Sequence, residues 1–250
     1  MRTREGGQKM DCREEERRTA ELLGMEAMDR LHRARVAVFG VGGVGGYACE
    51  ALARAGVGHL TLVDNDTVSL SNVNRQIIAL HSTVGKAKVE VMRARITDIN
   101  PDCEVEAINA FYLPERAEKF PLTGYDYIVD AVDTVAAKID LAVRATECGV
   151  PIISAMGAGN KLTAEGFTVT DLSKTSGCPL ARVMRQELKK RGITHLKVVY
   201  SEERAVPRAE DAPPSEESGT RRAPGSMPYV PGVAGLLIAG EVIRDLTRRT

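Results

Sequence analysis

The chain of 250 residues has no net charge, no paired cysteine motif and no long apolar run. Its 34 basic residues balance 34 acidic ones, so no overall field draws it to nucleic acid or to a membrane, and we expect no DNA partner. The cysteines are odd in number and widely spaced, which argues against a disulfide framework. No two cysteines are separated by the two intervening residues that are typical of a zinc site, so we also expect no zinc. They are Cys12, Cys49, Cys103, Cys148 and Cys178.

Segments for export or membrane insertion are missing as well. Residues 1–21 are charged and contain no apolar core of the kind that a signal peptide needs. The longest apolar run, at 232–240, is far too short to span a bilayer. We therefore expect a cytoplasmic protein with at most weak peripheral contact to a membrane through its apolar C-terminal segment.

A glycine-rich turn is the most informative stretch that is present. Residues 35–46 read RVAVFGVGGVGG, and an alanine-rich helical pattern follows from Tyr47 to Ala55. Val36, Val38 and Phe39 fit a short buried strand that runs directly into the glycines. Such a junction permits a tight turn and lets a phosphate approach the amides at the helix N-terminus. The turn therefore predicts a nucleotide site, without identifying the nucleotide.

Strand and helix patterns alternate along most of the chain. This order predicts an α/β, Rossmann-like fold, a mostly parallel twisted sheet with helices on both faces and an antiparallel C-terminal extension. Further expected strands cover 59–63, 103–108, 126–133, 151–155, 167–170 (at an edge) and 195–200. Expected helices cover 84–99, 134–148, 179–191 and 233–246, after one or two short helices between 18 and 32.

The composition predicts one folded unit with a loose beginning. Residues 1–17 are polar and are expected to be disordered, and 18–250 form a single domain. Within it, 201–228 carries several prolines and few apolar residues, which is typical of a flexible loop or crossover. Residues 229–250 then form a C-terminal helix that needs a partner surface to pack on.

Charged residues downstream of the glycines narrow the choice of nucleotide. Asp64 ends the second strand about 20 positions beyond them, where such folds bind a ribose hydroxyl pair. Arg75 and Lys88 suit the β- and γ-phosphates of a triphosphate. Asp133, at the carboxyl end of a strand, is suited to Mg²⁺, and Asp130 would either join it or cap the next helix. A nicotinamide-dependent oxidoreductase would leave these groups idle, so ATP is favoured.

Four ordered motifs also carry a family resemblance over roughly residues 15–172. The stretches GVGGVGG, VDNDTVSLSNVNRQ, VGKAKVEVMRARI and DAVDT are similar to the ubiquitin-activating-enzyme superfamily, which includes the ThiF-type adenylyltransferases of molybdopterin and thiamine sulfur carriers. Within it the chain most resembles the tRNA threonylcarbamoyladenosine dehydratases. That closer likeness rests on RTAELLG, INPDCEV, SAMGAGN, VTDLSKT and PLARVMRQELKKRGI.

The resemblance implies adenylation of a carboxylate with Mg²⁺ and ATP. In the dehydratases this carboxylate belongs to threonylcarbamoyladenosine next to the tRNA anticodon, and ring closure by the side chain's own carbamoyl group releases AMP. The partner would then be tRNA, with a sulfur-relay or sulfur-carrier protein as a further partner. The alternative is adenylation of the C-terminal glycine of a ubiquitin-like or sulfur-carrier protein.

The resemblance also implies which residues act. Arg18, Arg75, Lys88 and Asp133 would be catalytic, with Asp133 holding the metal. Arg18 would reach the γ-phosphate bound by a partner subunit, which implies a homodimer. The expected nucleotide-binding residues are Gly40, Gly42, Gly43, Gly45, Asp64, Asp66, Ser71, Asn72, Asn74, Arg75, Gln76, Lys88 and Asp133.

Other reactive side chains are interpreted as structural. Cys178 stands where related dehydratases tend to carry an acid, and a thiolate there could accept an acyl group. A small residue before a helix is the interpretation that we favour. We interpret the basic faces of the expected helices as solvent-exposed surfaces, with RNA contacts as the second interpretation. The histidines show no ligand spacing; they are His32, His59, His81 and His195.

Overall fold

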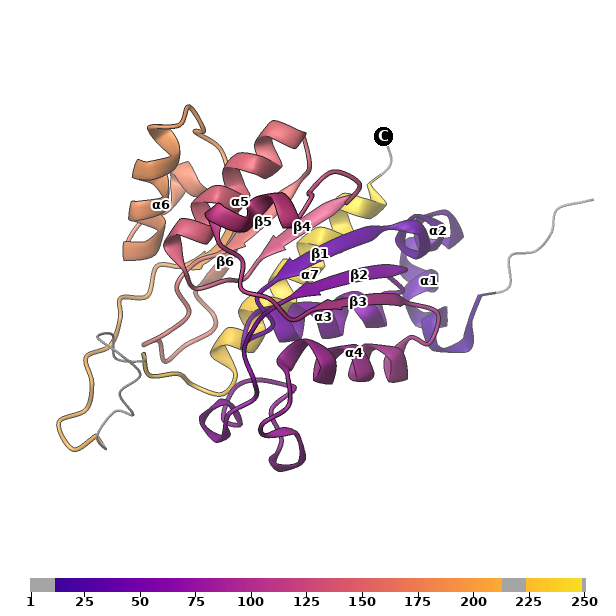
Figure 1. Cartoon of the computed structure of the whole chain (residues 1–250), viewed down its shortest axis with the longest axis horizontal. Coiled ribbons are helices and arrows are strands. Elements are labelled where there is room, and N and C mark those ends of the chain that lie inside the picture. The colour runs from indigo at the N-terminus through magenta and orange to yellow at the C-terminus, as the bar shows by residue number, and fades with distance from the viewer. Residues whose placement is uncertain (1–11, 213–223, 249–250) are drawn as a thin grey trace, which may run out of the picture.

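The computed structural model describes residues 12–212 and 224–248, and a sheet of seven strands forms its centre (Figure 1). The strand order is β3-β2-β1-β4-β5-β7-β6. All neighbours are parallel except β6, which pairs antiparallel with β7 at the edge. This confirms the predicted sheet. The strands are β1 (Arg35–Phe39), β2 (His59–Val63), β3 (Glu104–Ile108), β4 (Tyr127–Asp130), β5 (Ile152–Ala155), β6 (Phe167–Asp171) and β7 (Lys197–Ser201).

Helices cover both faces of the sheet, as expected. On one face α3, α4 and α7 pack with α2, and on the other lie α5 and α6 (Figure 1). The α-helices are α1 (Arg17–Leu23), α2 (Met25–Arg33), α3 (Gly45–Arg54), α4 (Lys88–Ile99), α5 (Val135–Cys148), α6 (Pro179–Lys189) and α7 (Val230–Thr247). Short 3₁₀ helices are η1 (Glu14–Glu16), η2 (Leu70–Asn72), η3 (His81–Thr83), η4 (Pro114–Lys119) and η5 (Leu172–Lys174).

The central strand β1 shows how the sequence produces this layering. Its side chains alternate between the two faces, as in any strand. Val36 and Val38 enter the core under α3 and α7, whereas Ala37 and Phe39 enter the core under α5. Since both faces are covered, β1 is apolar in consecutive positions, which is typical of a buried parallel strand.

Two predicted boundaries near the carboxyl end of the sheet are wrong. The helix expected from residue 84 begins at Lys88, because Gly85 has φ 86° and the Lys88 N–H donates to Asp66 O at 3.0 Å. The strand expected to reach Asp133 ends at Asp130. There the Val132 N–H donates to the Asp130 carboxylate at 3.3 Å as the chain turns.

The beginning of the chain is more ordered than its composition suggests. Disorder is the expectation for residues 12–17, but they include η1 and the first residue of α1. Glu16 is buried, and its Oε2 lies 2.9 Å from His32 Nε2. This polar contact holds the segment against α2. Residues 1–11 lie outside the described residues.

The predicted loop at 201–228 is only partly described. Ser201 belongs to β7, and residues 202–212 contain neither helix nor strand. Residues 213–223 lie outside the described part, and 224–229 lead into α7. That helix spans Val230–Thr247, close to the expected C-terminal helix.

The C-terminal helix α7 finds its partner surface on α3. A Cβ on Gly235 would lie 2.2 Å from Val44 O, and one on Gly232 would lie 3.2 Å from the Tyr47 ring. Glycines at these two positions therefore allow α7 to touch the first turn of α3 directly. No helix among residues 12–212 and 224–248 combines the length and the apolar character needed to cross a membrane.

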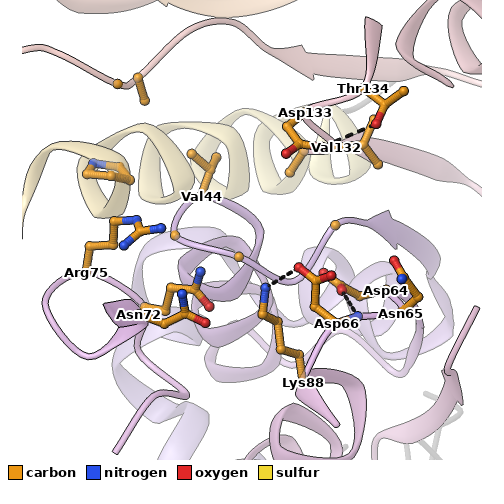
Figure 2. A pocket seen from close by; sticks show the side chains of 18 of the residues that line it. Val44, Asp64, Asn65, Asp66, Asn72, Arg75, Lys88, Val132, Asp133 and Thr134 are labelled. Atoms are coloured by element: carbon orange, nitrogen blue, oxygen red, sulfur yellow. Dashed lines mark hydrogen bonds and ion pairs between the residues drawn. The ribbon is translucent and has the colours of Figure 1, made fainter. Parts of the chain in front are cut away.

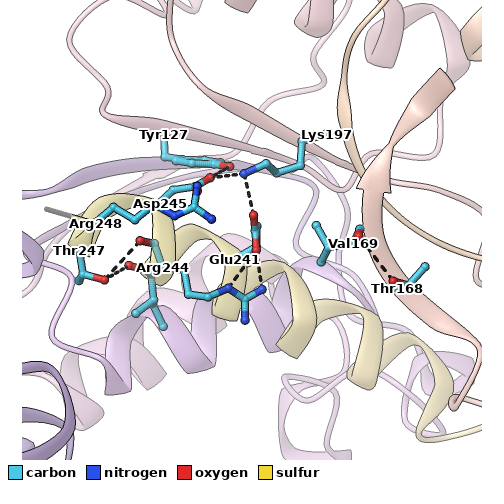
Figure 3. A network of polar contacts seen from close by, with 10 residues as sticks. Tyr127, Thr168, Val169, Lys197, Glu241, Arg244, Asp245, Thr247 and Arg248 are labelled. Atoms are coloured by element: carbon cyan, nitrogen blue, oxygen red, sulfur yellow. Dashed lines mark hydrogen bonds and ion pairs between the residues drawn. The ribbon is translucent and has the colours of Figure 1, made fainter. Parts of the chain in front are cut away.

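A polar network fixes the other end of α7 to the sheet (Figure 3). Lys197 Nζ, at the start of β7, lies 2.7 Å from Glu241 Oε1 and also donates to Asp245. Tyr127 OH donates to Asp245 at 2.8 Å, and Arg244 donates to Glu241. Burial opposes ionisation of Glu241, but the hydrogen bonds from Lys197 and Arg244 outweigh it and hold its pKa below the usual value.

This network predicts acid-sensitive stability. A carboxylate with a lowered native pKa stabilises the fold above its unfolded pKa of about 4.3, and this stabilisation disappears as pH falls from there through the native value. Glu241→Gln should lower the free energy of unfolding at neutral pH by about 1–3 kcal/mol, and the difference from the natural protein should shrink in acid. Denaturant unfolding measured across pH 3–7 tests this.

The matched control is Glu187→Gln on α6, a more exposed carboxylate that also pairs with two cations, Lys190 and Arg191. It should change stability little at any pH, because exposed ion pairs contribute little. A difference for Glu241→Gln that stays constant down to pH 3 would show that the carboxylate charge is not what anchors α7.

Candidate active site

A cavity of about 630 Å³ opens at the carboxyl ends of β1, β2 and β4. In the sheet, β2 and β3 lie on one side of β1, whereas β4 and the later strands lie on its other side. The strand order therefore reverses at β1. Open parallel sheets bind ligands at such a switch point. The lining comes from Gly40, 42–44, 63–66, Asn72, 75–76, Lys88, 110–112, 131–134, Ala137, 158–159, 224–226 and Pro231.

The glycine turn after β1 has two kinds of glycine. Gly40 has φ +90°, and a Cβ there would lie 2.5 Å from Ala131 O. A Cβ on Gly45 would lie 1.8 Å from Gly40 O, so both positions are required by the backbone itself. Gly42 and Gly43 line the cavity instead. Gly43 is crowded by α7 and not by sheet backbone, since a Cβ there would lie 3.1 Å from Pro231 Cβ.

The turn presents unpaired backbone donors to the cavity. Within the described part of the chain, no hydrogen bond accounts for the N–H groups of Gly42, Gly43 or Val44. They precede α3, which begins at Gly45, so the positive end of the helix dipole adds to them. Donors and dipole together form a site for an anion such as a phosphate.

The acidic end of β2 is organised by hydrogen bonds. Asp64 accepts from the Val41 N–H at 2.7 Å through Oδ2 and from the Asp66 N–H at 2.8 Å through Oδ1. Each oxygen keeps a lone pair for a ligand hydroxyl. Asp66 Oδ2 lies 2.7 Å from Nζ of the buried Lys88 (Figure 2). One carboxylate therefore faces the cavity with capacity to spare, and the other neutralises a buried cation.

Arg75 offers a cation without an acidic partner. Its Nη1 donates to Ser71 O and to Asn74 Oδ1, both at 2.9 Å, and no carboxylate of the described residues pairs with it. Burial lowers the pKa of this guanidinium, although arginine stays charged at neutral pH. The neighbouring Gln76 has a buried Oε1 with no hydrogen-bond partner in the structure. Both side chains line the cavity and have hydrogen-bonding capacity left for a polar ligand.

Asp133 enters the cavity from the β4 side. In Figure 2 it lies across from Lys88 and Asp66. Its carboxylate is exposed, and its one described contact is a long hydrogen bond of 3.4 Å from Thr134 Oγ1. It is therefore free to bind a cation or a ligand in the cavity.

Asp130 does not share this role. It is fully buried and lies 2.9 Å from Nζ of Lys138, which is also fully buried, and it accepts a hydrogen bond from Ser154. Lys138 Nζ also donates to Val132 O at 3.3 Å. The ion pair therefore supports the 131–134 wall from beneath. A lysine on the apolar face of the helix expected at 134–148 is the sequence signal for it.

An aromatic wall has no counterpart among the predicted residues. Ala110, Phe111 and Tyr112 follow β3 and line the cavity beside Asp64. Tyr112 OH donates to Asp140 at 2.5 Å and accepts from Arg144 at 2.7 Å, while its ring packs on Phe39. Burial and the Asp140 contact raise the pKa of Tyr112, so the phenol stays neutral. Nothing in the local pattern after the strand indicates this fixed wall.

The structure brings most of the predicted residues together, but not all. Ser71 and Asn74 lie behind Arg75 and hold it, and Gly45 serves the turn backbone, so none of the three lines the cavity. Asn72 lines it while its Oδ1 accepts from the Ser69 N–H. Arg18 is exposed on α1 and is not part of the cavity lining; Figure 1 shows α1 beside α2 near the amino end of β1, whereas the cavity lies at the carboxyl ends of the strands.

The other reactive residues lie outside the cavity lining. Cys178 is buried directly before α6. Three histidines face carboxylates: His32 faces Glu16, His59 faces Glu104 and His195 faces Asp171. All five cysteines are free thiols.

Comparisons with known proteins agree with this geometry. The ThiF family matches residues 15–250. A tRNA threonylcarbamoyladenosine dehydratase of Bacillus subtilis is 46% identical over 90% of this chain and 92% of its own. A molybdopterin-synthase adenylyltransferase of Escherichia coli is 38% identical over 64% of this chain and 61% of its own.

Solved structures give the same result. The Escherichia coli tRNA N6-threonylcarbamoyladenosine dehydratase in complex with ATP superposes with a TM-score of 0.84 and 34% identity, covering 94% of each chain. The same enzyme in complex with AMP gives 0.82 and 35% identity. With a family match over nearly its whole length, the chain belongs to the ThiF family.

Proposed function

We propose that this protein is an ATP-dependent tRNA threonylcarbamoyladenosine dehydratase that cyclises the modified adenosine next to the anticodon and releases AMP. The observation that carries the proposal is its 46% identity to the Bacillus subtilis dehydratase across 92% of that protein's length. The cavity supports it, because anion donors, two cations and a free carboxylate converge there.

The polarity of the cavity supports one orientation of ATP. Asp64 receives the ribose hydroxyls, with the base beside the aromatic wall at 110–112. The triphosphate lies against the free N–H groups of Gly42–Val44, where Arg75 supplies an unpaired cation and Lys88 a second one. Gln76 lies beside the glycine turn, since its Nε2 would be 3.8 Å from a Cβ on Gly42, and its amide oxygen has no hydrogen-bond partner in the structure.

Magnesium fits Asp133, because the other two cavity carboxylates are occupied: Asp64 accepts from backbone N–H groups and Asp66 pairs with Lys88. Among the described residues, no three acidic, histidine or cysteine side chains gather as a metal cage. Mg²⁺ commonly takes one or two carboxylates and completes its shell with phosphates and water, so Asp133 alone suffices to hold it. An ion held there by Asp133 would supply positive charge against the triphosphate.

The reaction then needs positioning more than protein nucleophiles. The threonylcarbamoyl carboxylate attacks the α-phosphorus, the bond to pyrophosphate breaks, and an acyl adenylate forms. The carbamoyl nitrogen or oxygen of the same side chain attacks the activated carbonyl, closes the ring and expels AMP. Arg75 and Lys88 stabilise the negative charge of the phosphates during the first step.

Two further features belong to the proposal. A second copy of the chain brings Arg18 to the γ-phosphate, since Arg18 lies far from its own cavity, so the enzyme is a homodimer. A tRNA substrate and five free thiols suit the cytoplasm. The similarity to a molybdopterin-synthase adenylyltransferase keeps a sulfur-carrier protein as the alternative substrate.

The central test uses the protein with Mg²⁺, ATP and tRNA that carries threonylcarbamoyladenosine. We expect the modified nucleoside to lose one water, seen by mass spectrometry, together with release of AMP and pyrophosphate. An unchanged nucleoside, with pyrophosphate exchange that depends on a small carrier protein, would instead assign the alternative function.

Replacing Asp133 tests the metal site. Asp133→Asn keeps the shape but removes the anion, and should slow ATP-dependent cyclisation about a thousandfold, since metal stabilisation is worth several kcal/mol and 1.36 kcal/mol corresponds to tenfold. Asp98→Asn, on the exposed face of α4, is the control and should leave the rate unchanged. A rate for Asp133→Asn within threefold of the natural enzyme would remove Asp133 from the metal site.

Mixing two inactive variants tests the action of Arg18 across subunits. Arg18→Ala and Asp133→Asn each disable one part of the site, but a mixed dimer keeps one complete site if Arg18 acts in trans. Random mixing should therefore restore about one quarter of the natural activity. Restoration is not expected if Arg18 acts within its own chain or not at all, so an inactive mixture would contradict the proposal.

A further inference from the structure

Residues 224–226, here called the strap, form a wall of the cavity that belongs to neither the sheet nor a helix. Pro224, Gly225 and Ser226 line the cavity together with Ala158 and Gly159. The strap meets its neighbours closely, because a Cβ on Gly159 would lie 2.7 Å from Pro224 Cβ. It is therefore seated on the 158–160 loop.

Asn160 holds the strap from one side. Its N–H donates to Gly225 O at 2.8 Å, and its Oδ1 accepts from the Gly225 N–H at 2.7 Å. Its own carbonyl accepts from the Val206 N–H at 2.7 Å. Asn160 has φ 55°, and among the described residues no other residue except glycine has a positive φ. A strained conformation of this kind persists where the surroundings require it, and such positions cluster at functional sites.

Asn74 holds the strap from the other side. Its Nδ2 donates to Ser226 O at 3.0 Å, while its Oδ1 accepts from Arg75 Nη1 at 2.9 Å. One amide therefore joins the strap to the cation that faces the phosphates. Pro231, just beyond the strap, packs against Gly43 of the glycine turn. The strap thus lies at the phosphate end of the cavity, away from Asp64 and the aromatic wall.

We propose that Asn160, with Asn74, is a positioning residue that holds the strap as a water-excluding wall over the acyl adenylate. This rests on the proposed function. The adenylate carbonyl can be attacked by the carbamoyl group, which closes the ring, or by water. In the second case a new bond forms from water oxygen to the carbonyl carbon, the bond to the phosphate oxygen breaks, and the starting carboxylate, AMP and one proton result. The wall suppresses this wasteful hydrolysis.

The test compares Asn160→Gly with Asn160→Asp. Glycine adopts the left-handed backbone without strain but lacks the Oδ1 acceptor, whereas aspartate keeps an acceptor and also tolerates that conformation. AMP released per ring formed is measured with threonylcarbamoyladenosine-containing tRNA. We expect Asn160→Gly to release at least about twofold more AMP per ring formed than the natural enzyme does. Asn160→Asp should release the same amount of AMP per ring as the natural enzyme. Any ring reopening in solution affects all three proteins equally.

Two accompanying measurements separate the outcomes. Hydrogen exchange should be faster at the amides of Gly225 and Ser226 in Asn160→Gly than in the natural protein, while the thermal midpoint stays unchanged. A natural ratio in Asn160→Gly despite faster exchange would overturn the proposal, and so would equal losses of AMP release and ring formation, which indicate a structural role. Failure of the natural enzyme to form any ring would overturn the proposed function instead.

Discussion

The contact between α7 and the first turn of α3 is the constraint on which the site depends. Val44 O would lie 2.2 Å from a Cβ on Gly235, and Pro231 packs on Gly43, so the last helix of the chain directly touches the glycine turn. The network around Lys197 and Glu241 fixes the other end of the helix to the sheet. Because α7 is held at both ends, the strap that precedes it is also positioned at the cavity.

The cations around the cavity are not equivalent. Lys138 is neutralised by Asp130 beneath the β4 wall, and Lys88 is paired with Asp66. Arg75, by contrast, donates to a carbonyl and an amide oxygen only. A guanidinium that is bound to neutral acceptors exchanges them for a phosphate more readily than one that is bound to a carboxylate. The exchange replaces a weaker hydrogen bond by a stronger, charge-assisted one. Arg75 is therefore the cation best prepared to meet an incoming triphosphate.

The residues that could be predicted are those fixed by local sequence order. In a parallel sheet the carboxyl ends of neighbouring strands meet, so the glycine turn, Asp64 and Asp133 had to converge once the strands were recognised. The strap and Phe111 could not be found in this way, because their places depend on packing between segments far apart in the chain. The late start of α4 has the same origin, since a tertiary hydrogen bond to Asp66 O sets it.

The two sides of the cavity differ in how firmly their walls are held. The wall at 110–112 is anchored by buried contacts of Tyr112 with Phe39, Asp140 and Arg144. The strap rests on hydrogen bonds at the surface, where water competes for every donor and acceptor. Segments with exposed backbone hydrogen bonds and few apolar contacts open at the lowest free energy. The strap is therefore the wall of the cavity that opens at the lower free energy, whereas the wall at 110–112 stays fixed.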